Sequence, residues 1–421
     1  MQSSSARPDT SASVQGQGSH LGHDAHPGQA ARAEKDPHGA HDGGAAVPAT
    51  HPRADGRTLA LLQALRAFAA IAVIIYHCHS EALNWLYPGQ PRPPEIFPWM
   101  AGVDVFFVIS GFIIVLSSRK LFGAPGGFRL FVMRRLIRVL PLYWAMTSLF
   151  LLVVLLAPGV LNSGVPDWRQ ILASYLFFPW PRADGLALPV YSLGWTLNYE
   201  MMFYTLCAGA VLLPRRLAVM AVALVLGLGV LIGALAGPLP EPFQFWTRPL
   251  VLDFIFGLFL GLLYGRGVAI SPLLAWPGAL VAVALLAMDL PTRPPLSDWP
   301  TLGPIAGYGL PATLLVAMAA FGETQKLSAR VVGRIDFFRR PFASVVRVFA
   351  ELGDASYALY LLHPFIIRAM RQVFVMLGFG TWMTSTLFAL AGVIASSIGG
   401  WLLYRLVEAP VLRWLRRRAG V

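Results

Sequence analysis

The chain has 421 residues, of which 56% are hydrophobic and only 13% are charged, and its formal net charge is +12. Soluble globular chains carry about 25% charged residues, so this composition excludes a single soluble core. The apolar residues come in blocks of roughly 20, the length that a helix needs to cross a bilayer, which predicts an all-α, polytopic membrane bundle. The positive charge lies in short stretches between these blocks, which argues against nucleic acid as a partner.

Residues 1–56 are polar, rich in Gly, Ala, Pro and Ser, and contain six His. This composition predicts a disordered tail, which we expect on the cytoplasmic side. A His-rich tract can bind metal, but the spacing here is irregular and no Cys accompanies it, so we expect no metal. Cys78 and Cys207 lie in apolar blocks, which indicates packing residues rather than a disulfide.

Beyond the tail the sequence predicts about ten membrane-spanning helices. Their approximate bounds are 59–78, 98–118, 137–158, 193–213, 216–236, 247–265, 270–289, 304–321, 351–374 and 383–405. The membrane domain is therefore expected over 57–408, followed by a basic cytoplasmic tail, 409–421. The long connection 159–192 contains an apolar stretch that suits an interfacial or re-entrant segment.

The Lys and Arg residues fix the orientation. With the N-terminus inside, the cytoplasmic connections, the span ends beside them and the C-terminal tail carry 20 Lys and Arg residues. The opposite loops carry five: Arg92, Arg169, Arg182, Arg248 and Arg293. Cytoplasmic loops carry the excess of Lys and Arg, so both termini are expected in the cytoplasm and the protein in the inner (plasma) membrane.

The first span contains Arg66 and His77, which lie eleven residues apart. In a helix that spacing is roughly 16 Å along the axis and only about 20° around it, so both share one stripe. A central Arg costs about 2.5–3.5 kcal/mol in a bilayer and normally faces a polar interior. Arg66 could instead extend toward the cytoplasm and His77 could be an interfacial residue, and the pair alone leaves this open.

Carboxylates in two other spans favour a polar interior. Asp104 lies in the outer part of the second span, and Glu200 lies in the fourth, close to Trp195 and Asn198. Buried carboxylates in lipid need partners, and these two fall at a depth similar to that of His77. A His beside a carboxylate is the basic arrangement for general-base catalysis on a hydroxyl, whereas Trp195 and Asn198 are candidates for substrate binding.

The third span opens with a basic face at its cytoplasmic end. Arg134, Arg135 and Arg138 fall on about one helical turn, and Tyr143 and Trp144 follow. Each Arg taken singly is explained by topology, but together they suit a phosphate-rich ligand arriving from the cytoplasm.

The ninth span places His363 near the middle of the membrane. Its side chain either lines the cavity and binds substrate or is a structural hydrogen-bonding group, and the sequence favours neither.

Five segments, in order along the chain, resemble the motifs of the membrane-bound acyltransferase-3 family. They are LRAFAAIAVIIYH, GVDVFFVISGFII, RRLIRVLPLYW, GWTLNYEMMFY and LGDASYALYLLHPF. The first matches an Arg-x10-His pattern, and the fourth looks most like the subgroup that acetylates exopolysaccharide. The resemblance covers residues 59 to about 408 and implies about ten helices, an acetyl-CoA or other acyl-CoA donor and a sugar hydroxyl as acceptor.

The resemblance also implies roles at matching positions. His77 would be the catalytic histidine, Arg66 its motif partner, and Glu200 the acidic residue of the fourth segment. Arg135 and Arg138 would contact the CoA phosphates. Some members carry a further extracytoplasmic domain after the membrane part, which we do not expect in this chain.

The predicted function is therefore O-acylation of a surface polysaccharide or other glycan, with membrane lipid and the polysaccharide-synthesis machinery as candidate partners. Glu200 or Asp104 is expected to orient His77, and direct transfer and an acyl-histidine intermediate both stay open. Two rival interpretations are a transporter of a lipid-linked sugar, with the charged groups along its path, and a non-catalytic partner of a polysaccharide synthase.

Overall fold

The computed structural model describes residues 59–90, 97–156, 166–182, 184–288, 304–322, 336–379 and 384–421, with side chains in the segment 336–379 described from 344 onward. Within these ranges the chain is helical and contains no strand. The α-helices are α1 (Ala60–Leu86), α2 (Gly102–Ser117), α3 (Gly127–Leu156), α5 (Trp168–Tyr175), α6 (Trp195–Ala210), α7 (Arg215–Leu235), α8 (Phe243–Trp246), α9 (Leu252–Tyr264), α10 (Pro272–Ala287), α11 (Leu310–Gly322), α13 (Asp336–Asp354), α14 (Ser356–Met376), α15 (Ser385–Leu403) and α16 (Ala409–Ala419). Short 3₁₀ turns precede α2, α6 and α9, and π-helical turns lie at Ile305–Gly309 and Tyr404–Glu408.

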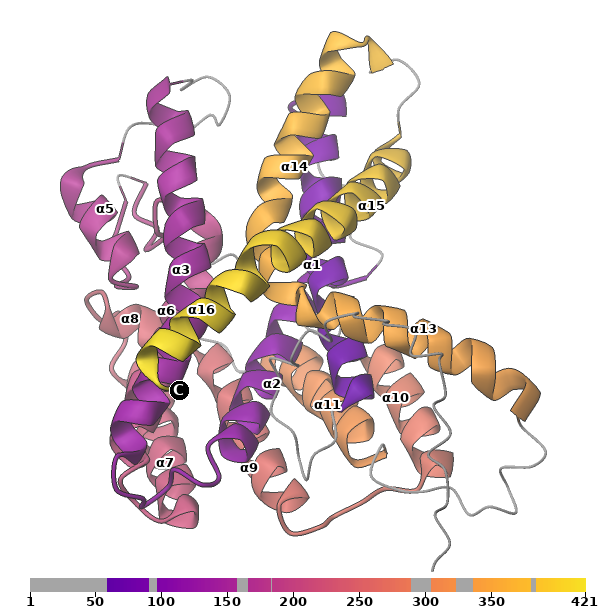
Figure 1. The fold of residues 1–421 in the computed structure, drawn as a ribbon. Coiled ribbons are helices and arrows are strands. Elements are labelled where there is room, and N and C mark those ends of the chain that lie inside the picture. The colour runs from indigo at the N-terminus through magenta and orange to yellow at the C-terminus, as the bar shows by residue number, and fades with distance from the viewer. Residues whose placement is uncertain are drawn as a thin grey trace, which may run out of the picture. The chain divides into compact units, whose positions relative to one another are not determined.

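A helix overlaps each predicted span (Figure 1), so the all-helical prediction is confirmed for the described residues. Six of these helical stretches are long and apolar enough to cross a membrane: Ala60–Leu86, Trp99–Ser117, Gly127–Leu156, Arg215–Leu235, Ile305–Gly322 and Ser385–Ala419. Two shorter apolar stretches are Pro249–Tyr264 and Pro272–Ala287. The count of ten spans remains a prediction.

The helices α2 and α9 pack with their backbones in contact. A Cβ atom added at Gly111 would lie 2.2 Å from the carbonyl oxygen of Phe254, and one at Gly257 would lie 2.0 Å from that of Val108. A real Cβ cannot occupy either position, so this crossing requires glycine on both helices. Close approach of small residues is a common way to pack helices in a membrane, where no hydrophobic effect drives association.

The ninth predicted span begins too early. Residues 351–354 are the end of α13, an amphipathic helix that lies along α1, and α14 starts after Ala355. The contact is close, because a Cβ at Gly353 would lie 1.9 Å from the carbonyl oxygen of Gln63, and Phe68 stacks on Phe349 with ring centroids 4.4 Å apart. A hydropathy pattern alone does not separate an amphipathic helix from the apolar helix that follows it.

The C-terminal part is one helical path. Figure 1 shows α15 continuing through the π-turn Tyr404–Glu408 into α16, which packs against α3. Pro410 explains the wide turn, because it lacks an N–H and its ring would clash with the carbonyl of Leu406 in a regular α-helix. The predicted tail 409–421 is thus helical over Ala409–Ala419.

The long connection 159–192 contains one short helix, α5, in its described part. Asp167 caps α5 by accepting a hydrogen bond from the Gln170 N–H at 2.7 Å. The predicted disordered tail, 1–56, and its His-rich tract lie outside the described residues.

Candidate active site

A cavity of about 910 Å³ lies between α1, α2, the α2–α3 connection, α3, α6, α14 and α16. Seven cationic side chains line it: Arg66, Arg119, Lys120, Arg134, Arg135, Arg138 and Arg416. Of the acidic side chains in the described residues, only that of Glu200 belongs to this lining. The predicted cationic face of α3 is therefore part of a larger cationic cavity, and Arg66 and Glu200, from two other helices, face the same space.

The cavity changes character along its length. Its cationic mouth, which we define as the exposed residues Arg119, Lys120 and Arg134, lies at the α2–α3 connection and the start of α3. Aromatic side chains, among them Phe106 and Tyr360, line another part. A cavity with a cationic part and an aromatic part suits a ligand that carries anionic groups at one end and a less polar arm at the other.

Glu200 is held on the cavity wall by two hydroxyl groups. The hydroxyl of Ser110 donates to its Oε1 at 3.1 Å, and the hydroxyl of Tyr204, one turn along α6, donates to the same oxygen. The Arg135 guanidinium lies 5.6 Å from the centre of the Tyr204 ring and donates to the Ser117 hydroxyl at 2.5 Å. These contacts fix both charges without a direct ion pair between them.

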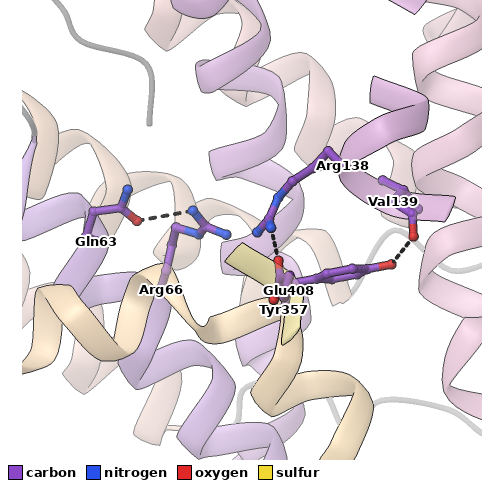
Figure 2. A network of polar contacts seen from close by, with 6 residues as sticks. All are labelled: Gln63, Arg66, Arg138, Val139, Tyr357 and Glu408. Carbon is purple, nitrogen blue, oxygen red and sulfur yellow. Dashed lines mark hydrogen bonds and ion pairs between the residues drawn. The ribbon is translucent and has the colours of Figure 1, made fainter. Parts of the chain in front are cut away.

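Arg66 and Arg138 lie near one buried carboxylate, as Figure 2 shows. Arg138 forms an ion pair with Glu408, while Arg66 donates to the side-chain oxygen of Gln63 at 3.1 Å and also lies within the electrostatic reach of Glu408. The Arg138 guanidinium lies 5.1 Å from the centre of the Tyr357 ring, and the Tyr357 hydroxyl donates to the Val139 carbonyl at 2.8 Å. A phosphate bound by Arg138, as the sequence predicts, would have to compete with this ion pair.

His77 does not line this cavity. Its ring contacts that of His363, with centroids 5.1 Å apart, and His363 in turn contacts the ring of Tyr360 at 6.0 Å. Tyr360 does line the cavity, and its hydroxyl lies 2.9 Å from that of Thr196. The histidine pair therefore lies directly behind the Tyr360–Thr196 contact.

His363 is fully buried and has one engaged ring nitrogen. Its Nδ1 lies 3.2 Å from the Leu359 carbonyl oxygen, which can only accept, so Nδ1 carries the proton. Its Nε2 has no hydrogen-bond partner among the described residues and is left as an acceptor. His363 lies outside the cavity lining and bonds to a backbone carbonyl, as the structural interpretation expects, while its part in substrate binding stays a prediction.

The predicted orienting carboxylates lie elsewhere. Glu200 is bound to Ser110 and Tyr204, and Asp104 is buried in the first turn of α2, outside the cavity lining. His363 is the ring in contact with His77, and the pairing of His77 with a carboxylate stays a prediction.

Tyr143 and Trp144 hold α5 and do not line this cavity. The Tyr143 hydroxyl donates to the Ser174 carbonyl at 3.2 Å, and the Trp144 indole N–H donates to the Tyr175 carbonyl at 3.0 Å. Both side chains are thus bonded to α5, and their part in donor binding stays a prediction.

Trp195 and Asn198 also lie outside this lining. Trp195 packs edge-on against Tyr199, with ring centroids 6.0 Å apart. Asn198 is fully buried, and both polar atoms of its amide lack a hydrogen-bond partner among the described residues. Asn198 lies two residues before Glu200, about 200° around α6, so the two cannot face the same space.

Several residues in or beside the cavity lining were not predicted from the sequence. Glu408, which lies outside the lining and holds Arg138, could have been recognised as a lone carboxylate at the end of an apolar span, followed by proline in VEAP. The topology rule alone accounts for Arg119, Lys120 and Arg416 in the sequence, and Ser110 and Tyr204 carry no signal beyond their spacing from Glu200. No cluster of three or more His, Cys, Asp or Glu that could hold a metal occurs within the described ranges.

Comparison with known proteins places the chain in a family. The model of the acyltransferase-3 family, described as an acyltransferase domain, matches residues 59–405. The chain is 32% identical over 321 residues to the exopolysaccharide production protein ExoZ of Rhizobium meliloti, covering 76% of this chain and 91% of that protein. It is 28% identical over 396 residues to the acyltransferase MdmB of Streptomyces mycarofaciens, covering 86% and 93% respectively.

A shorter match is to the putative peptidoglycan O-acetyltransferase YrhL of Bacillus subtilis, 31% identical over 156 residues, which is 34% of this chain and 22% of that protein. The search of solved structures found no match. The family model spans every motif segment that carried the resemblance, as well as all the lining residues of α1, α2, α3, α6 and α14. The chain therefore belongs to the acyltransferase-3 family and is an acyltransferase with membrane-type helices.

Proposed function

We propose that the protein transfers an acyl group, most simply acetyl, from cytoplasmic acyl-CoA to a sugar hydroxyl of a surface polysaccharide or related glycan. The observation that carries the proposal is the cationic cavity, whose lining residue Tyr360 is in ring contact with His363 of the histidine pair. The names of the relatives, which refer to exopolysaccharide production and to peptidoglycan O-acetylation, support a glycan acceptor.

The donor fits the cavity by charge and by size. CoA carries a diphosphate and a 3′-phosphate on its nucleotide end, and Arg side chains bind phosphate oxygens in bidentate geometry. The cationic mouth and Arg135 and Arg416 would receive these phosphates, and the volume of about 910 Å³ lies at the upper end of the 300–1,000 Å³ range typical of small-molecule sites. The uncharged pantetheine arm would extend along Phe106 toward Tyr360.

The proposed reaction needs two proton transfers, one from the acceptor hydroxyl and one to the leaving thiolate. His77 would take the proton of the acceptor hydroxyl as its oxygen attacks the thioester carbonyl, so that a C–O bond forms and the C–S bond breaks. The imidazolium would then return the proton to the leaving thiolate, giving free CoA. In the covalent alternative, His77 itself accepts the acyl group before the hydroxyl attacks.

His363 would assist His77. Since its Nδ1 proton is held by the Leu359 carbonyl, its Nε2 is available to accept a proton or a hydrogen bond from the neighbouring imidazole. It thus takes the orienting role that the sequence assigned to a carboxylate, with a neutral ring in place of a charge that would be costly in the membrane.

The test is direct. Purified protein is incubated with acetyl-CoA and an isolated surface glycan, and free thiol and ester-linked acetate on the glycan are both measured. Acceptor-dependent thiol release with matching acetate on the glycan is expected. Acetylated glycan formed without acyl-CoA consumption would contradict the donor, and thiol release without acetylated glycan would contradict the acceptor class.

A further inference from the structure

Glu408 is a buried carboxylate that the proposed reaction has not used. Its side chain is 2% exposed, and it forms an ion pair with Arg138, whose side chain is 20% exposed. Its second oxygen, Oε2, has no hydrogen-bond partner among the described residues. A buried charge is costly, and a structural role would be met equally well by an apolar pair, so this pair requires another reason.

The position of Glu408 depends on the π-turn. The turn Tyr404–Glu408 adds one residue to the helical path before Pro410. This extra residue rotates the Glu408 side chain around the helix axis relative to the apolar residues of α15. Single π-turns inside α-helices occur frequently at functional sites. Here the turn directs the carboxylate toward α3 and α1, as Figure 2 shows.

Glu408 lies close to two guanidinium groups. Arg66 and Arg138 repel one another, while Glu408 attracts both, and Asp354 and Glu200 also attract Arg66. In Figure 2 the two guanidinium groups point toward each other, with Glu408 beside Arg138. Without Glu408, Arg138 would lose its ion pair and would be free to bind an anion that enters this part of the cavity.

The cations of the lining differ in exposure. Arg119, Lys120 and Arg134 are exposed, whereas Arg66, Arg135, Arg138 and Arg416 are partly buried. The ion pair with Glu408 makes Arg138 less available to an anion than the exposed side chains of Lys120 and Arg134. A ligand with phosphates at one end is bound in one direction by this difference.

We propose that Glu408 is a positioning residue that keeps Arg138 from binding phosphate, so that the donor binds with its phosphates at the mouth and its uncharged arm, instead of a phosphate, passes Arg138. This inference rests on the proposed function, since it assumes an acyl donor with phosphate groups. It does not require Glu408 to touch the donor, because its effect is exerted through Arg138.

The Glu408→Gln variant tests the charge at constant size. Glutamine retains an oxygen that accepts from Arg138 but leaves the inner cavity one positive charge richer. The expected result is a fall in kcat of at least tenfold, while the Kd of CoA measured by calorimetry is unchanged or lower. A purely structural defect would weaken CoA binding together with kcat, and that result, or a kcat within twofold of the wild type, overturns the inference.

A second comparison keeps the test decisive if Glu408→Gln does not fold. The double variant Arg138→Gln/Glu408→Gln removes both charges, a change that buried pairs often tolerate. If Glu408 acts through Arg138, the double variant has the same kcat as Arg138→Gln alone. A further loss of tenfold or more in the double variant overturns the inference.

A matched control is Asp184→Asn, which removes the exposed carboxylate that pairs with Arg182 at 3.1 Å outside the cavity. It is expected to retain wild-type kcat and CoA binding. If the wild-type protein neither binds nor consumes acyl-CoA, the proposed function fails and this inference with it. An active wild type with an equally active Glu408→Gln variant rejects the inference alone.

Discussion

His77 on α1 and His363 on α14 lie in ring contact, with centroids 5.1 Å apart. One ring is fully buried with a nitrogen held by a backbone carbonyl, and the other is only partly buried. His363 is therefore fixed in one tautomer, and we expect His77 to be the ring that the acceptor reaches.

Replacing His77 with Ala should abolish transfer. The variant loses the proposed base, which typically contributes about 10²–10⁴-fold to a rate, while every cationic residue of the cavity stays in place. We expect acetylation to fall by at least about 10²-fold with an unchanged Kd for CoA. Steady-state acetylation and CoA calorimetry would be measured on the same detergent preparation.

His79 provides the matched control for His77. It lies two residues farther along α1, about 200° around the helix, so it faces another direction. His79→Ala should retain activity within about twofold of the wild type. Normal acetylation by His77→Ala, or an equal loss in His79→Ala, would remove the general-base role from His77.

Two isosteric substitutions separate the nitrogens of His363. Asparagine places an N–H near the position of Nδ1 and can still donate to the Leu359 carbonyl, whereas glutamine places a polar group near the position of Nε2. If His363 acts on His77 through Nε2, Gln should retain more activity than Asn, and both should lower kcat with little change in donor KM. Equal activity in both variants would indicate a structural hydrogen bond only.

The sequence was sufficient to assemble much of the cavity wall. Arg66, Arg135, Arg138 and Glu200 come from three separate spans, and helical spacing together with the cost of charge in lipid predicted that they face one interior. Helical spacing and the cost of charge in lipid are properties of a single helix. They therefore predict which side chains face the bundle interior wherever the helix is regular.

Positions that depend on rotation or on contacts distant in sequence were not predictable. Tyr143 follows Arg138 by five residues, about 140° around α3, so it faces α5 instead of the cavity. The pairing of Glu408 with Arg138 joins helices far apart in the chain and depends on a π-turn, which no regular periodicity describes.

Reporter fusions test the proposed orientation. The excess of Lys and Arg on one side predicts a cytoplasmic C-terminus and an external connection at 291–300. A phosphatase reporter, which is active only outside the cytoplasm, should be inactive when fused after Val421 and active when inserted in 291–300. The opposite pattern would place the cationic mouth on the side that lacks CoA and would exclude the proposed donor.

The glycine contact between α2 and α9 sets a stability prediction. In Gly111→Ala the new methyl group would lie 2.2 Å from the Phe254 carbonyl oxygen, which forces the helices apart and should lower stability by about 1–3 kcal/mol. Gly209→Ala in α6 is the control, because nothing lies within 4 Å of its Cβ position and alanine favours a helix interior. Thermal unfolding in one detergent should show a lower Tm for Gly111→Ala and an unchanged or higher Tm for Gly209→Ala.

The cationic mouth and the neighbouring Arg135 should bind the phosphates of the donor. Arg134, which belongs to the mouth, and Arg135 are the candidates on α3, since Arg138 is paired with Glu408. A hydrogen bond to a charged group contributes about 1.5–3 kcal/mol, so Arg134→Ala/Arg135→Ala should raise the Kd of CoA by on the order of a hundredfold or more at low salt. Lysine replacements should restore only part of the affinity, because lysine offers a point charge without the planar fork of arginine.

Salt and a truncated ligand make this last prediction specific. The loss in the double variant should shrink as ionic strength rises, because screening weakens the wild-type contacts as well. Dephospho-CoA, which lacks the 3′-phosphate, should show a smaller difference between the two proteins than CoA does. The control is Arg418→Ala on α16, whose guanidinium lies over the Trp414 ring outside the cavity lining and should not affect binding. An unchanged CoA affinity in Arg134→Ala/Arg135→Ala would leave these residues as topology determinants, and the phosphate site would then have to lie elsewhere, for example in the basic segment 326–347.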